Sequence, residues 1–208
     1  FLESCSYEIG RTFFPTVGHC ETLLEGIDPG DSELCLMARP DRYDIKTLEP
    51  CSGKIKTLRF AFYGKDVAGA IECVKIAKGL GYKVYLNPIN VTNYSLDDFK
   101  QVLEVCVDAG AHGISIVDTF GSLDANSFRE YLAVISDTLN PNQEIGLHLH
   151  ENLSSSFPFI QDALVDESIN NDIIIDASLL GMGRIPGNLP VELVAAYLNR
   201  DFSKNYEV

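Results

Sequence analysis

Short apolar runs recur along the chain at intervals of roughly 23 to 32 residues, and a helical pattern fills most of the intervals. This rhythm predicts alternating strands and helices, which form a parallel sheet with right-handed connections. The expected strands are residues 1–4, 33–38, 57–63, 83–87, 113–118, 144–150 and 172–176. The expected helices are residues 65–79, 96–109, 125–139, 157–164 and 190–198.

Seven such units fit either an open doubly wound sheet or an incomplete (β/α)₈ TIM barrel. No Gly-x-Gly-x-x-Gly follows the first run, which disfavours a dinucleotide-binding sheet. Polar residues end several strands, as around one central cavity. We therefore expect a single catalytic barrel domain over residues 1–208. The polar strand-end residues are Arg39, Tyr63, Asn87, Asp118, His150 and Asp176.

The amino-acid composition argues against some classes of binding partner. With 30 acidic against 16 basic residues the net charge is −14, which disfavours nucleic acid and anionic membranes as partners. No apolar run reaches the length of about 18 residues that a membrane span needs. The six cysteines form no Cys-x-x-Cys motif, which is typical of reduced thiols in a cytoplasmic protein. The chain opens at Phe1 in the middle of an apolar pattern, so we expect a further segment upstream.

The segment 144–152 reads as an apolar strand that ends in His-x-His. Side chains two apart on a strand share a face, so His148 and His150 present two imidazoles side by side. Neutral imidazoles are good ligands for divalent metals, and we take the pair as metal ligands. The alternative is a hydrogen-bonded core pair. A 2-His-1-carboxylate site also needs a carboxylate.

Two aspartates and a threonine follow neighbouring strands. Asp118 could bind the metal, orient a ligating histidine, or brace its loop. Thr119 could offer its hydroxyl to a substrate carboxylate or carbonyl. Asp176 has the same ambiguity as Asp118, with loop bracing slightly favoured.

The last loop, residues 181–188, contains three glycines, which allow backbone N–H groups to approach a ligand. Asn188 could cap the following helix or supply an amide oxygen to a metal. Arg184 could hold a substrate carboxylate, or be a solvated charge.

Two further polar residues lie in apolar strands. Arg59 would pair with an acid or contact substrate, because a buried guanidinium needs a partner. Asn87, at the end of its strand, is a candidate polar lining residue.

Three motifs together resemble the last strand ends of the DRE-TIM metallolyases. They are Val-Asp-Thr-Phe-Gly-Ser at 117–122, Gly-Leu-His-Leu-His-Glu-Asn-Leu at 146–153, and the stretch from Asp176 to Glu192. That family includes 4-hydroxy-2-oxovalerate aldolase, 3-hydroxy-3-methylglutaryl-CoA lyase, and the isopropylmalate and homocitrate synthases.

The resemblance implies a (β/α)₈ barrel that binds Mg²⁺ or Mn²⁺ through His148, His150 and Asn188. It also implies an Asp ligand and an Arg on a first strand, which we expect upstream of Phe1. We assign Asp118 and Arg184 as catalytic residues, and Thr119, Asn87 and Arg59 as substrate-binding residues.

The loop after Asp176 lacks the cysteine of the lyase branch, which favours the aldolase branch. The expected activity is metal-dependent cleavage of a 4-hydroxy-2-oxo acid through an enolate, with pyruvate or a related 2-oxo acid as product. The alternatives are an acyl-CoA-dependent Claisen-type lyase or synthase and a non-catalytic barrel domain. A homodimer and a partner dehydrogenase stay open.

Overall fold

The computed structural model describes residues 1–184 and 186–208. Six strands are hydrogen-bonded in chain order, β1 to β6, and the pairings β1–β2, β2–β3, β3–β4 and β5–β6 have parallel registers. The strands are β1 (Leu34–Ala38), β2 (Ile55–Phe62), β3 (Lys83–Pro88), β4 (Gly113–Asp118), β5 (Glu144–Leu149) and β6 (Ile173–Asp176). The sequence prediction of a parallel α/β sheet is thus confirmed.

The main helices match the predicted ones to within a few residues. They are α2 (Val67–Gly79), α3 (Leu96–Asp108), α4 (Ala125–Thr138), α5 (Ser156–Val165) and α6 (Val191–Asp201), with a short α1 (Val17–Glu21) before β1. Single 3₁₀ turns are η1 (Thr22–Leu24), η2 (Ile45–Thr47), η3 (Gly64–Asp66), η4 (Val91–Asn93) and η5 (Leu179–Gly181). Among the described residues, no helix is long and apolar enough to cross a membrane.

The expected strand at residues 1–4 is wrong. Only Leu2 pairs in a strand-like way, through isolated bridges to Phe14 and Ala38. The N–H of Leu2 donates to Met37, but the N–H of Glu3 turns to Phe14 and that of Ser4 to Arg42. Because these partners lie on different segments, no continuous ladder forms.

The chain divides into two compact units, each described here by itself. The first comprises Phe1–Pro88 and Val102–Ile114, and the second Ile89–Gln101 and Ser115–Val208. The prediction of one domain over residues 1–208 stays a prediction.

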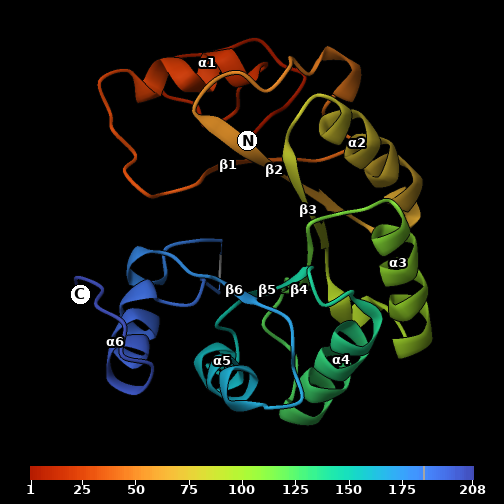
Figure 1. Cartoon of the computed structure of the whole chain (residues 1–208), viewed down its shortest axis with the longest axis vertical. Coiled ribbons are helices and arrows are strands. Elements are labelled where there is room, and N and C mark those ends of the chain that lie inside the picture. The colour runs from red at the N-terminus through yellow and green to blue at the C-terminus, as the bar shows by residue number, and fades with distance from the viewer. Residues whose placement is uncertain (185) are drawn as a thin grey trace. The chain divides into compact units, whose positions relative to one another are not determined.

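In the first unit, α2 packs on β2 and β3 (Figure 1). The helix buries Ala70, Val74 and Ala77 at helical spacing. The strand residues Leu58, Phe60 and Leu86 are fully buried. This face is apolar, and the residues that alternate with it, such as Arg59 and Asn87, therefore lie on the other face.

In the second unit, α4 and α5 contact each other beside the strands (Figure 1). The rings of Phe128 and Phe159 stack between the two helices, with centroids 4.6 Å apart. Ile145 and Leu147 of β5 are fully buried, so the alternate residues of β5, which include His148, face the other side of the sheet.

Candidate metal centre

Two histidines at the carboxyl end of β5 form the centre of the candidate site. His148 lies in the strand and His150 directly follows its last residue. Their ring centroids are 5.1 Å apart, with the ring planes at 79°. The alternation of the strand predicted this, because residues two apart lie on one face.

Each imidazole is held through its Nδ1 atom by an oxygen. Nδ1 of His148 lies 2.9 Å from Oδ2 of Asp176, and Nδ1 of His150 lies 2.9 Å from the carbonyl oxygen of Asp118. Carbonyl and carboxylate oxygens accept hydrogen bonds, so each Nδ1 carries the hydrogen and each Nε2 keeps its lone pair. Metal-binding histidines are oriented in this way.

The pKa of His150 is lowered from its usual range. Burial is the largest cause of the lowered pKa, the hydrogen bond to the Asp118 carbonyl opposes it, and the neighbouring His148 and Arg184 lower the pKa further. The ring is therefore neutral at neutral pH, which is the state that binds a metal.

Asn188 lies beside the histidines, and an isolated antiparallel bridge pairs it with His150. Its Nδ2 donates to the carbonyl of Met182 at 2.9 Å, which leaves Oδ1 as the side-chain atom suited to a cation. The alternative of a helix cap does not hold, because Pro190 is the N-cap of α6. A Cβ on Gly183 would overlap Nδ2 of Asn188, so glycine at residue 183 leaves room for this position of the Asn188 side chain.

Asp118 is 2 % exposed, and both its carboxylate oxygens are used within its own loop. They accept the backbone N–H groups of Ser122 and Leu123, each at 3.0 Å. The carboxylate thus braces the loop after β4, while the carbonyl orients His150. The geometry favours a positioning role for Asp118 over the predicted catalytic one, which stays a prediction.

Asp176 contacts one of the two histidines. It lies opposite His148 in the β5–β6 register, and the contact of its carboxylate with that ring favours an orienting role beside the predicted loop bracing, which stays a prediction. The signal that could have found it is the register: two neighbouring parallel strands that end in His and Asp bring these side chains together.

Thr119 and Arg184 complete the set in the second unit. The hydroxyl of Thr119 accepts the N–H of Asn90 at 2.8 Å, so it links two loops. The side chain of Arg184 is exposed, and its charge is close enough to lower the pKa of His150. Ile185, inside the predicted loop 181–188, lies outside the described residues.

The first unit holds the other two predicted substrate-binding residues on one sheet face. Arg59 pairs in register with Tyr85, and its guanidinium carbon lies 5.8 Å from the centroid of that ring. Asn87, paired with Ala61, is 2 % exposed, and its Oδ1 has no hydrogen-bond partner in the described part of the chain. A buried acceptor without a hydrogen-bond partner costs about 1–3 kcal/mol of folding free energy. Such an acceptor is typical of a side chain that contacts a ligand or water.

The donor atoms suit a divalent cation only in part. The two Nε2 atoms and the amide oxygen of Asn188 would supply three neutral ligands. Within the described residues, no cluster of three or more His, Cys, Asp or Glu could hold a metal. The carboxylate of the expected 2-His-1-carboxylate set is therefore not among them.

Comparison with known proteins gives one consistent family. The HMGL-like family model matches residues 41–206. The chain is 25% identical over 146 residues to 4-hydroxy-2-oxovalerate aldolase 2 of Comamonas testosteroni, and 30% identical over 131 residues to homocitrate synthase of Sulfolobus acidocaldarius. These alignments cover 70% and 63% of this chain but only 41% and 27% of the two relatives.

Solved structures share the fold. The N-terminal domain of a candidate aldolase from Bacteroides vulgatus matches 99% of this chain and 68% of its own, with a TM-score of 0.77 and 22% identity. Hydroxymethylglutaryl-CoA lyase from Pseudomonas aeruginosa matches 86% of this chain and 66% of its own, with a TM-score of 0.68 and 15% identity. At these identities the likeness shows the fold alone.

Proposed function

Since this chain belongs to the HMGL-like family of DRE-TIM metallolyases, we propose that it is part of a divalent-metal-dependent aldolase acting on 4-hydroxy-2-oxo acids. The observation that carries the proposal is the histidine pair. Both imidazoles are held by oxygens at Nδ1, which leaves a lone pair on each Nε2. Histidines that bind a metal are held in this way at the nitrogen that does not contact the ion.

In this proposal His148, His150 and Asn188 hold Mn²⁺ or Mg²⁺. When bound, the cation supplies Lewis-acid stabilisation of the negative charge that develops on the 2-oxo acid. The proposal also requires a further Asp ligand and an Arg, which the family resemblance leads us to expect on a strand upstream of Phe1 in a complete (β/α)₈ barrel. The shared fold with the Bacteroides domain and the sequential strand order support that barrel.

Other residues of the chain would bind and orient the substrate. The guanidinium of Arg184 would pair with its carboxylate, and Thr119 would donate its hydroxyl hydrogen to an oxygen of the substrate. The substrate-binding roles predicted for Arg59 and Asn87, in the first unit, stay predictions. In the reaction the 4-hydroxyl loses its proton and the bond between C3 and C4 breaks to give an aldehyde and an enolate. A proton then adds to C3 of the enolate, which gives the 2-oxo acid.

The test is release of pyruvate from 4-hydroxy-2-oxopentanoate by the full-length protein with Mn²⁺, coupled to lactate dehydrogenase. We expect activity in the wild type and in His19→Ala, whose histidine is exposed and lies on α1. We expect its loss in the His148→Ala/His150→Ala variant. Equal activity in all three would refute the assignment of the pair.

A Claisen-type reaction on an acyl-CoA is the second candidate. It is favoured by the 30% identity with homocitrate synthase. The two candidates separate in one experiment: turnover of acetyl-CoA with a 2-oxo acid, with no pyruvate released from the hydroxy-oxo acid, would select the synthase reaction.

A further inference from the structure

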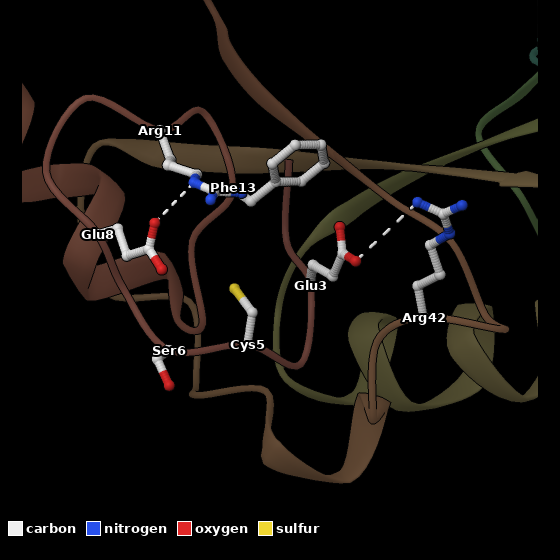
Figure 2. A pocket seen from close by; sticks show the side chains of 7 residues that line it. All are labelled: Glu3, Cys5, Ser6, Glu8, Arg11, Phe13 and Arg42. Carbon is white, nitrogen blue, oxygen red and sulfur yellow. Dashed lines mark ion pairs between the residues drawn. The ribbon is translucent and has the colours of Figure 1, made fainter.

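A hollow in the first unit is lined by none of the candidate site residues described above. Its volume is about 330 Å³, similar to small ligand pockets. Residues of the N-terminal segment 3–13 form most of its lining, and Arg42, from the loop after β1, completes it (Figure 2). Its charged lining consists of Glu3, Glu8, Arg11 and Arg42, with Phe13 and Cys5 between them.

Backbone hydrogen bonds fasten this wall to the sheet. The N–H of Leu2 donates to Met37 at the end of β1, and the N–H of Ser4 donates to Arg42 at 2.9 Å. The hydroxyl of Ser4 also accepts the N–H of Asp44 at 2.9 Å. The hollow is therefore attached beyond the carboxyl end of β1, and ligands of parallel α/β sheets bind at that edge.

The lining has two acidic and two basic side chains, so its charges cancel, but its two ion pairs differ in length. Arg11 Nε and Glu8 Oε2 are 2.7 Å apart, whereas Arg42 Nη1 and Glu3 Oε1 are 4.0 Å apart, too far for a hydrogen bond. The side chain of Arg42 is 52% exposed and that of Glu3 28%. Such exposed pairs stabilise a fold little, so a ligand can separate this one at small cost.

We propose that this hollow binds an α-amino acid with an apolar side chain. The carboxylate of the ligand would lie on the Arg42 guanidinium, its ammonium group on Glu3, and its side chain against Phe13. A zwitterion carries two opposite charges a few bonds apart, so it can replace the long contact between Glu3 and Arg42 by pairing with each of them. A simple anion would meet Glu3 and Glu8, and a simple cation would meet Arg11 and Arg42.

The first test compares three ligands of one shape: L-leucine, 4-methylpentanoate, which lacks the ammonium group, and 3-methylbutylamine, which lacks the carboxylate. Calorimetric titration of the full-length protein should show L-leucine binding roughly tenfold or more tightly than either analogue, because each analogue loses a charge-assisted contact. Equal affinities for all three would overturn the proposal. So would the absence of binding by leucine, methionine, valine and phenylalanine at about 10 mM.

Variants assign the contacts. Arg42→Gln and Glu3→Gln should each weaken L-leucine binding by roughly tenfold or more. Arg129→Gln is the matched control, because this arginine is 58% exposed and paired with Asp162 in the second unit. Unchanged affinity in Arg42→Gln, or an equal loss in Arg129→Gln, would contradict the proposal.

Two exposed cysteines locate the site without reference to any catalytic activity. Both Cys5 and Cys35 are exposed. Cys5 lines the hollow, whereas Cys35 lies on β1 and is not one of the lining residues. Bound L-leucine should slow alkylation of Cys5 by N-ethylmaleimide severalfold and leave Cys35 unchanged, as read by peptide mass spectrometry. Failure to protect Cys5, or equal protection of both thiols, would rule out this hollow as the site.

Discussion

At the scale of single residues, the candidate site depends on the atoms that orient the two imidazoles. Asp176 holds His148 with a carboxylate, while Asp118 holds His150 with a backbone carbonyl. A side-chain substitution can remove only the first of these contacts. The orientation of His148 can therefore be tested by a substitution at residue 176, whereas that of His150 cannot be tested in this way.

Replacing Asp176 with Asn should lower the affinity of the full-length protein for Mn²⁺ by roughly 10–100-fold, because the His148 ring loses its carboxylate partner. Calorimetric titration with Mn²⁺ measures this. Asp162→Asn is the control, since that exposed carboxylate pairs with Arg129. If Asp176→Asn bound Mn²⁺ as tightly as the wild type, Asp176 would have no orienting role.

Gly183 tests the position of Asn188 in the same way. A Cβ at residue 183 would overlap the end of the Asn188 side chain, which must then move away. Gly183→Ala should therefore weaken Mn²⁺ binding severalfold but change the free energy of unfolding by less than about 1 kcal/mol, because only a flexible amide shifts. Gly79→Ala, where a Cβ meets nothing within 4 Å, should leave Mn²⁺ binding unchanged, and it should stabilise the protein by up to about 1 kcal/mol because residue 79 ends α2.

At the scale of elements, β4 and β5 approach closely beneath the histidines. A Cβ on Gly146 would lie 2.8 Å from Cβ and 3.2 Å from Cα of Ser115, so backbone as well as side chain blocks it. The close approach of these strands requires glycine two residues before His148. The site and the packing of the sheet are thus coupled at this position.

Gly146→Ala should destabilise the protein by about 1–3 kcal/mol through overpacking. Adding Ser115→Gly, which removes the nearest side chain, should restore part of that loss. Ser115→Gly alone should destabilise the protein less than Gly146→Ala does. Urea denaturation of the four proteins gives the coupling energy. A zero coupling energy would show that the two residues do not meet.

The same elements show what the sequence could and could not predict. The runs that became β2 to β6 were found because apolar residues dominate them, and the shared face of His148 and His150 followed from strand alternation. Residues 1–4 have a similar apolar start, but a strand needs a continuous partner, which the sequence did not show. The contact of Asp176 with His148 required the β5–β6 register, which is a property of two strands and not of either one.

At the scale of the whole molecule, the chain has 30 acidic and 16 basic residues, so its net negative charge attracts cations without specificity. Non-specific attraction and binding at the histidine pair must therefore be separated. Only binding at a folded site is lost with the fold, and such binding stabilises the folded state by mass action.

Mn²⁺ should raise the midpoint of thermal unfolding of the full-length protein. At a concentration about 100 times its dissociation constant, the gain in unfolding free energy should be about 2.7 kcal/mol. His148→Ala/His150→Ala should lose this gain, whereas His19→Ala should keep it, because His19 lies on α1 and bonds to Thr16. KCl at matched ionic strength separates the effect from screening of the acidic surface. If Mn²⁺ stabilised the double variant as much as the wild type, the cation would be acting on the net charge, and the histidine pair would not be its site.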